Sequence, residues 1–208
     1  MTLVKFCGIT RVEEALMAQR LGAWAIGEVF APSRRQIDAE QAAAINYSLD
    51  GSIAKIGVFV DEDLAKVLDI VRYCALDMVQ LHGEEPPEYL DELPVPAIKV
   101  FCLSGAVDEK EIRRWRPWAY AFDTYSRAEY RGGNGHSFNW EWLESIRGHE
   151  RMILAGGLNP QNVGPAIRKI KPLAVDVSSG VEYASGGKDP QQMEQFFKQV
   201  READRYES

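Results

Sequence analysis

Hydrophobic residues recur along the chain in eight short runs, and each run is followed by a more polar stretch with helical spacing. Most of the runs are rich in Val, Ile, Ala or aromatic residues, which is typical of parallel strands buried on both faces. The runs begin near Leu3, Trp24, Ala54, Leu76, Pro96, Trp118, Arg151 and Pro172. The clearest helical stretches are Val12–Leu21, Asp61–Tyr73, Asp108–Trp115, Pro160–Lys169 and Asp189–Ala203.

Several helix starts carry recognisable capping residues. Thr10 precedes a helix and is followed three residues later by Glu13, which is the spacing of a capping box. Asp61 and Asp108 are expected to be N-caps of later helices, and Pro160 fits the first position of another.

Eight strand–helix units without a linker or a break in composition predict one closed α/β barrel, the (β/α)₈ or TIM-barrel fold, formed by residues 1–208 as a single domain. An open flavodoxin-like sheet is the alternative, but that sheet needs about five strands. Two gaps, Phe30–Asp38 and Thr124–Phe138, are longer than the others. Because active sites of this fold lie where strands end and βα loops begin, we expect these two loops to cover the substrate.

Composition excludes several classes of protein. Hydrophobic residues at 46% and charged residues at 26% are ordinary for a globular chain and unlike a disordered one. A net charge of −7 repels nucleic acid and anionic membranes, so we expect neither as a partner. No apolar run approaches the roughly 18 residues needed to span a bilayer. The three widely spaced cysteines indicate a reducing cytoplasm, without disulfides or a zinc site.

The first strand carries a possible nucleophile or base. Side chains alternate along a strand, so Lys5 and Cys7 share a face. If that face is the barrel interior, Cys7 lies at the catalytic rim with Lys5 one layer below, and a thiol near a cation is a candidate for an activated thiolate. The alternative is a small buried hydrophobic residue, an interpretation that also suits Cys74 and Cys102.

A buried ammonium group needs a partner. Asp176 lies on the last strand, which neighbours the first strand in a closed barrel, so we expect a Lys5–Asp176 contact beneath the site. This pair either favours the thiolate of Cys7 by Coulomb attraction or is a purely structural ion pair.

Polar residues end three further strands. Arg34 and Arg35 follow the second strand, where a guanidinium could bind a carboxylate or a phosphate, or could form a solvated surface pair. His82 ends the fourth strand and is either structural or part of the site. Asp123 ends the sixth strand and is a candidate general acid, the alternative being a cap or a turn residue.

The loops after the last two strands have the composition of an anion site. Gly156 and Gly157 follow the seventh strand, and Ser178, Ser179 and Gly180 follow the eighth. Glycines let backbone N–H groups approach an anion, and phosphate sites of this fold form after strands seven and eight. The alternative is a tight turn in each loop. Walker, dinucleotide-binding and zinc-protease motifs are absent from the sequence.

In these motifs the chain resembles the phosphoribosylanthranilate isomerase family over nearly its whole length. The shared motifs are KFCGIT (Lys5–Thr10), GVFV (Gly57–Val60), VQLHG (Val79–Gly83), Asp123, LAGGLNPQNV (Leu154–Val163), VDVSSGVE (Val175–Glu182) and GKD (Gly187–Asp189). The resemblance implies a (β/α)₈ barrel without metal or organic cofactor. It also implies an Amadori rearrangement of N-(5-phosphoribosyl)anthranilate to the carboxyphenylamino-deoxyribulose phosphate in tryptophan biosynthesis.

The resemblance further implies residue roles. Cys7 matches the general base, Asp123 the general acid, and Arg35 the arginine that contacts the anthranilate carboxylate. His82 and Asp176 match further substrate-binding positions. The phosphate-binding positions are Gly156, Gly157, Ser178, Ser179 and Gly180. A monomer and a homodimer both remain open.

Three positions depart from the family pattern. The second loop has Ser33-Arg34-Arg35 where the family usually has Ser-Pro-Arg or Ser-Lys-Arg, so either arginine could meet the substrate. Glu28 replaces an apolar residue, and we expect it either at the rim, paired with Arg34, or as a local defect. Gly186 replaces a common proline.

Two other functions compete with this interpretation. The sister isomerase of histidine biosynthesis, or a dual-substrate version, catalyses a similar reaction, but it uses Asp where Cys7 stands and shows a half-barrel repeat that is not found here. A non-catalytic phosphosugar-binding barrel would need neither Cys7 nor Asp123.

Overall fold

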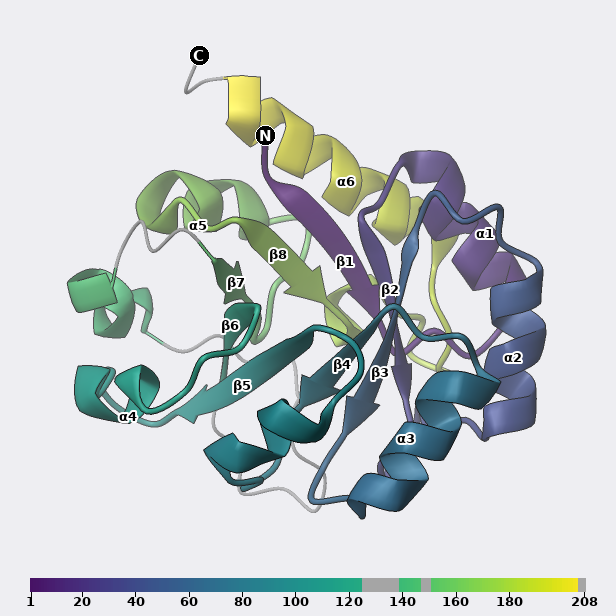
Figure 1. Cartoon of the computed structure of the whole chain (residues 1–208). Helices are drawn as coiled ribbons and strands as arrows, with labels where there is room; N and C mark the ends of the chain where they lie inside the picture. The colour runs from purple at the N-terminus through teal and green to yellow at the C-terminus, as the bar shows by residue number, and fades with distance from the viewer. Residues whose placement is uncertain (125–138, 147–150, 206–208) are drawn as a thin grey trace.

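Eight parallel strands close into a barrel in the order β1 to β8 (Figure 1). The structure, a computed structural model, describes residues 1–124, 139–146 and 151–205. The predicted (β/α)₈ fold is confirmed, and the open-sheet alternative is wrong. The strands are β1 (Leu3–Cys7), β2 (Ala25–Val29), β3 (Ala54–Phe59), β4 (Met78–Leu81), β5 (Ala97–Leu103), β6 (Ala119–Thr124), β7 (Met152–Leu154) and β8 (Ala174–Val177).

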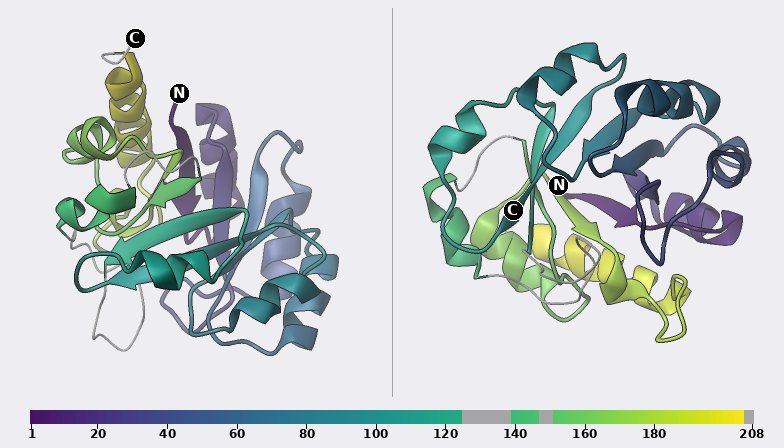
Figure 2. Two further views of the ribbon diagram at one scale, coloured as in Figure 1. Left: turned by 60° about the vertical axis from the view of Figure 1, so that its left-hand side comes forward. Right: turned by 90° about the horizontal axis from the view of Figure 1, so that it is seen from below.

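Helices and short 3₁₀ turns surround the barrel (Figure 2). The helices are α1 (Val12–Leu21), α2 (Ala39–Tyr47), α3 (Leu64–Tyr73), α4 (Glu109–Arg113), α5 (Val163–Ile170) and α6 (Pro190–Arg205). The 3₁₀ turns are η1 (Pro87–Glu92), η2 (Trp140–Ile146) and η3 (Ser179–Val181). Within the described residues, no helix is both long enough and apolar enough to cross a membrane.

Two of the expected helix caps lie at or near the predicted place. Asp108 caps α4, as predicted, by accepting a hydrogen bond from the Lys110 amide at 2.9 Å. The prediction for Asp61 is wrong, because Asp63 caps α3 by accepting from the Ala65 amide at 2.9 Å.

The capping box predicted at Thr10 is wrong. Arg11 is the N-cap of α1 and makes no side-chain cap, while the Thr10 amide donates to Glu14 at 2.9 Å. Glu14 also accepts from the Lys188 amide at 2.8 Å, so a tertiary contact replaces the local box. Pro160 is not in the first turn of α5 either, because that helix begins at Val163.

Apolar side chains fill two layers. A large cluster packs between the outer faces of the strands and the helices, and includes Phe6, Ile26 and Phe196. A smaller cluster fills the barrel interior with Ala25, Ile56, Met78, Ile98, Val100, Ala119, Ala121, Ile153 and Ala174. Burial of such surface contributes roughly 25 cal/mol per Å². Towards the carboxyl ends of the strands this cluster is joined by charged and polar residues.

Candidate active site

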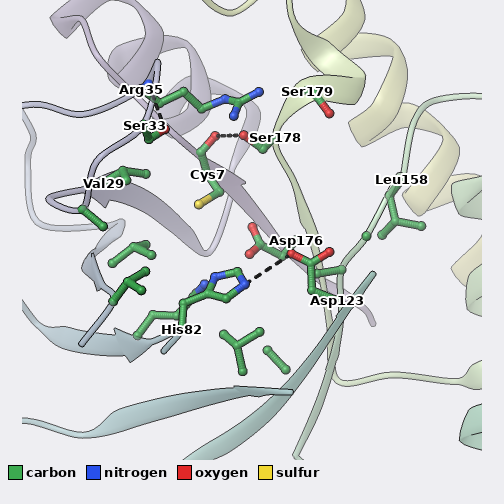
Figure 3. Close-up of a pocket in the computed structure, with 18 of the residues that line it drawn as sticks. Cys7, Val29, Ser33, Arg35, His82, Asp123, Leu158, Asp176, Ser178 and Ser179 are labelled. Carbon is green, nitrogen blue, oxygen red and sulfur yellow. Dashed lines mark hydrogen bonds and ion pairs between the residues drawn. The ribbon is translucent and has the colours of Figure 1, made fainter. Parts of the chain in front are cut away.

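A cavity of about 360 Å³ opens at the carboxyl ends of the strands (Figure 3). All the predicted site residues except Gly180 line it. The lining residues are Cys7, Val29, Ala31, Pro32, Ser33, Arg35, Val58, Val60, Gln80, His82, Val100, Ala121, Asp123, Ala155, Gly156, Gly157, Leu158, Asp176, Ser178 and Ser179. Four of them lie in the expected loop Phe30–Asp38, whereas residues 125–138 of the other expected loop fall outside the described residues.

The predicted Lys5–Asp176 contact is confirmed. Parallel pairing of β1 with β8 places the two residues opposite one another, and Lys5 Nζ lies 2.8 Å from Asp176 Oδ2. Lys5 is fully buried. Gly27 on β2 makes this packing possible, because a Cβ there would come within 2.8 Å of Cys7 Sγ and 3.0 Å of Lys5 Nζ. The ammonium therefore lies beneath the thiol, in the layer below the cavity.

Burial and charge act in opposite directions on Cys7. Loss of hydration is the larger effect and raises the pKa of the thiol. Attraction to Lys5, attraction to Lys188 and a hydrogen bond with Lys5 lower that pKa, while Asp176 raises it. Attraction to Lys5 thus acts towards the thiolate, but its effect on the pKa of Cys7 is smaller than that of burial.

Asp123 is a buried carboxyl group at the end of β6. Burial, assisted by the charge of Asp176, raises its pKa to about 6 despite a 2.6 Å hydrogen bond from the Thr124 amide. Its Oδ2 lies 3.6 Å from Nε2 of His82 (Figure 3). A carboxyl group with a raised pKa holds its proton nearer to neutral pH than an exposed one does, which suits a proton donor.

Arg35, and not its neighbour Arg34, faces the cavity; Arg34 is exposed to solvent. The loop turns so that the Arg35 amide donates to Ser33 Oγ at 3.0 Å. The guanidinium forms two hydrogen bonds with Glu182, from Nε at 2.7 Å and from Nη2 at 2.8 Å. Of the two arginines, only Arg35 therefore lines the cavity.

Of the two expectations for Glu28, the position at the rim, paired with Arg34, is wrong, whereas the local defect agrees with the structure. The side chain is fully buried outside the barrel, where it accepts a 3.1 Å hydrogen bond from Asn46 Nδ2 on α2, and it does not meet Arg34. Since Gly27 faces the barrel interior, strand alternation turns Glu28 towards the helices. A buried carboxylate oxygen, Oε1, has no hydrogen-bond partner.

The two glycine-rich loops meet beside the cavity. Gly156 and Gly157 have φ values of 81° and 63°, which favour glycine, and the Gly157 carbonyl accepts from Asn162 Nδ2 at 2.9 Å. Ser178 Oγ donates to the Cys7 carbonyl at 3.0 Å. Gly180 lies behind the cavity wall, where a Cβ would overlap the carbonyl of Leu158.

Three polar residues near the site were not assigned a role from the sequence. Gln80 lines the cavity, and its position two residues before His82 could have indicated this. Glu182 and Lys188 form an ion pair at 2.6 Å behind Arg35. Glu182 ends the VDVSSGVE motif and Lys188 lies in the GKD motif. Their place in motifs shared with the family could have indicated that they lie near the site. The described residues contain no group of three or more His, Cys, Asp or Glu placed to hold a metal ion.

A closed parallel barrel with a cavity at the carboxyl ends of its strands, lined by acidic, basic and thiol side chains, defines the class of (β/α)₈-barrel enzymes. The family model described as N-(5'-phosphoribosyl)anthranilate (PRA) isomerase matches residues 4–199. The chain therefore belongs to this family of isomerases of tryptophan biosynthesis.

Individual relatives support the same family. The N-(5'-phosphoribosyl)anthranilate isomerase of Syntrophomonas wolfei is 56% identical over 202 residues, which are 97% of this chain and 98% of that protein. The crystal structure of the Thermus thermophilus enzyme superposes with a TM-score of 0.88 at 36% identity, covering 97% of this chain and 99% of the other. A second structure is that of a phosphoribosyl anthranilate isomerase in complex with reduced 1-(o-carboxyphenylamino)-1-deoxyribulose 5-phosphate. It superposes with a TM-score of 0.82 at 37% identity, covering 97% of this chain and 100% of the other.

Proposed function

We propose that this cavity converts N-(5-phospho-β-D-ribosyl)anthranilate to 1-(2-carboxyphenylamino)-1-deoxy-D-ribulose 5-phosphate, with Asp123 as general acid and Cys7 as general base. One observation carries the proposal: a carboxyl group with a raised pKa and a thiol above a buried ammonium line the same cavity. The reaction needs one group that gives a proton and another that takes one.

The proton transfers balance without a cofactor. Asp123 donates its proton to the furanose ring oxygen, the C1′–O bond breaks, and the nitrogen lone pair forms the C1′=N bond of a protonated, open-chain Schiff base. Cys7, as the thiolate, removes the C2′ proton, and the electron pair moves to give a neutral enolamine. The enolamine then ketonises by shifting a proton to C1′. Lys5 stabilises the thiolate on which the second step depends.

Substrate binding uses the remaining residues of the cavity. Arg35 contacts the anthranilate carboxylate, and His82 and Asp176 contact the sugar portion. The phosphate binds at Gly156, Gly157, Ser178 and Ser179, where backbone N–H groups can approach an anion, and Gly180 supports this site by letting the two loops pack together. The binding partner is thus a small phosphosugar, and anchoring the phosphate orients the reacting carbon.

A fluorescence assay with phosphoribosylanthranilate tests the proposal. We expect activity in the wild type, a loss of at least ~10²-fold in kcat for Cys7→Ser, and loss of turnover for Asp123→Asn with the fold intact. Cys102→Ser is the matched control, because Cys102 lies on β5 and does not line the cavity. A Cys7→Ser variant that keeps more than about a tenth of wild-type kcat would show that Cys7 is not the base.

The same assay separates the competing functions. Turnover of the corresponding histidine-pathway aminoaldose in place of the anthranilate compound would favour the sister isomerase. Binding of the phosphosugar without turnover would favour a binding barrel.

A further inference from the structure

Glu182 and Lys188 lie beside the cavity without a part in the proton transfers just described. Both belong to a tight hairpin that follows η3, in which the two residues face each other across an antiparallel bridge. Gly186 has a φ of 95° in this hairpin, a conformation that the usual proline of the family cannot adopt. The Lys188 amide is held at 2.8 Å by Glu14 at the start of α1. The hairpin is therefore fixed at both ends.

The carboxylate of Glu182 is shared between two cations. Arg35 donates to its two oxygens at 2.7 and 2.8 Å, and Lys188 Nζ lies 2.6 Å from Oε1. Lys188 Nζ also donates to the carbonyl and to the hydroxyl of Ser178, at 3.2 and 3.3 Å. One continuous set of contacts therefore joins Arg35 on the β2 loop to Ser178 on the β8 loop.

These groups are shielded from solvent, so their interactions are little screened. The hydrogen bonds and the attraction of the two cations lower the pKa of Glu182 to about 2, overcoming the opposite effect of burial. Glu182 is therefore ionised throughout the neutral range. Burial lowers the pKa of Lys188, an effect that the attraction and the hydrogen bond of Glu182 oppose.

The stem of Arg35 is fixed as well as its head. Gly8 has a φ of 75°, and a Cβ at that position would overlap Cδ of Arg35. Packing against the Gly8 backbone limits where the stem can lie, and the two-point contact with Glu182 fixes the plane of the guanidinium.

We propose that Glu182 and Lys188 are positioning residues, which hold Arg35 and Ser178 so that the carboxylate and the phosphate of one substrate meet two anion sites at a fixed separation. The proposal rests on the proposed function. Glu182 acts through Arg35 and sets the affinity for the carboxylate. Lys188 contacts both Glu182 and Ser178, and through Ser178 it sets the affinity for the phosphate.

Two product analogues that differ only in the carboxylate test the first part. The probes are reduced 1-(o-carboxyphenylamino)-1-deoxyribulose 5-phosphate and its phenylamino counterpart without the carboxylate. For Glu182→Gln we expect about 10-fold to 100-fold weaker binding of the first probe, unchanged binding of the second, and unchanged inhibition by inorganic phosphate. KM for the substrate should rise by a similar factor, with kcat changing less than KM.

A double-variant cycle distinguishes positioning from a general structural role. If Glu182 acts through Arg35, Glu182→Gln should add nothing to the loss of affinity in an Arg35→Gln background, whereas independent effects would add. Arg34→Ala is the matched control, because Arg34 is the exposed neighbour and should leave all three ligands unaffected. An equal loss of affinity for both probes in Glu182→Gln would overturn the proposal. So would losses of affinity that add in the variant carrying both Glu182→Gln and Arg35→Gln.

Lys188→Met tests the second part and also serves if Glu182→Gln does not fold. We expect inorganic phosphate to compete several-fold less well, by loss of the contacts to Ser178, and unchanged inhibition by phosphate would contradict the proposal. Wild-type turnover of phosphoribosylanthranilate is measured first. If the wild type is inactive, the proposed function fails; if it is active and the variants bind as the wild type does, only the positioning proposal fails.

Discussion

Two buried charged side chains, Lys5 and Glu28, lie on neighbouring strands but on opposite sides of the barrel wall. Lys5 points into the interior and lies 2.8 Å from a carboxylate of opposite charge, Asp176. Glu28 points outward into the helix layer and receives one hydrogen bond from a neutral amide, Asn46, at 3.1 Å. Both side chains are fully buried, so the difference between them is the partner and not the depth.

The partner decides which charge state is stable. Attraction and hydrogen bonding from Asp176 and Cys7 more than offset the burial of Lys5, and the pKa of Lys5 is raised. Around Glu28, burial outweighs the hydrogen bond from Asn46 and the weaker attraction of Lys55, and the pKa rises to about 7. Lys5 therefore stays charged, whereas Glu28 changes its charge near neutral pH.

The groups facing Glu28 come from several elements. Asn46 on α2 donates both to Glu28 and to the Cys74 carbonyl at 3.0 Å, and the Cys74 thiol donates to the Ala39 carbonyl. Lys55 on β3 is the cation that acts on Glu28, and it forms a 3.0 Å ion pair with Asp77. Oε1 of Glu28 has no hydrogen-bond partner among these groups. Burial of this oxygen therefore costs less free energy when the carboxyl group is protonated than when it is charged.

The largest effect is expected from Lys5→Met. Removing the ammonium leaves Asp176 buried without its partner, which should cost about 3–5 kcal/mol in the free energy of unfolding, measured with urea. If Lys5 also stabilises the thiolate, its loss should raise the pKa of Cys7. Alkylation of Cys7 at pH 7 should then slow, and the limb of the kcat–pH profile that reports the general base should move to higher pH.

Lys99→Met is the matched control for that variant. Lys99 is buried and paired with Glu85 at 2.8 Å, outside the barrel interior. This variant should also lose stability but leave the alkylation of Cys7 unchanged. Unchanged alkylation in Lys5→Met as well would leave only the structural function of the Lys5–Asp176 pair.

The second effect is a pH dependence that Glu28 imposes on stability. Between its ordinary pKa of 4.5 and about 7, the folded state holds a proton that the unfolded state has lost, so stability falls as pH rises. Relative to Glu28→Gln, the free energy of unfolding of the wild type should fall by at most about 3 kcal/mol across this pH window, and it should not fall further above pH 7. Parallel pH profiles of the urea midpoints of the two proteins would contradict the expectation.

Asn46→Ala should have a smaller effect. The variant removes the hydrogen bond to Glu28 and the one to the Cys74 carbonyl, and should cost about 1–3 kcal/mol at pH 8. It should also move the pH at which Glu28 titrates upward. In a Glu28→Gln background that pH shift should vanish, and its persistence would assign the dependence to another group.

Lys55→Met should have the smallest effect. The ion pair with Asp77 lies near the surface, where such pairs contribute about 0–1 kcal/mol. Loss of the attraction should raise the pKa of Glu28 slightly, which thermal unfolding at pH 6, 7 and 8 would detect. A change larger than that of Asn46→Ala would reverse the order of importance proposed for the two neighbours.

Features that follow from strand periodicity could be predicted from the sequence. The alternation of residues and the closure of the barrel are enough to place Lys5, Cys7 and Asp176 on one interior face, and the glycine-rich loops follow from the order of the strands. These inferences need only the local repeat and the topology.

Features that depend on tertiary contacts could not be predicted in the same way. Glu14, and not the predicted Glu13, binds the Thr10 amide, and it also holds the distant Lys188 amide, which no local pattern indicates. The choice between Arg34 and Arg35 depends on a loop without a repeat, and the partner of Arg35 lies 147 residues away. The outward direction of Glu28 follows from strand alternation, but its hydrogen-bond partner Asn46 on α2 is a tertiary contact that no local pattern indicates.

The close approach of Gly180 to the Leu158 carbonyl has a consequence for recombination between relatives. The loops after β7 and β8 are in contact through their backbones. Each loop therefore packs only against a neighbouring loop whose backbone follows the same course as in this protein. A chimaera with its crossover between these strands would combine loops from different parents. If the parent that supplies β8 has any larger residue at the Gly180 position, that side chain would overlap the β7 loop and the two loops would not pack together. A crossover before β7 keeps these two loops together.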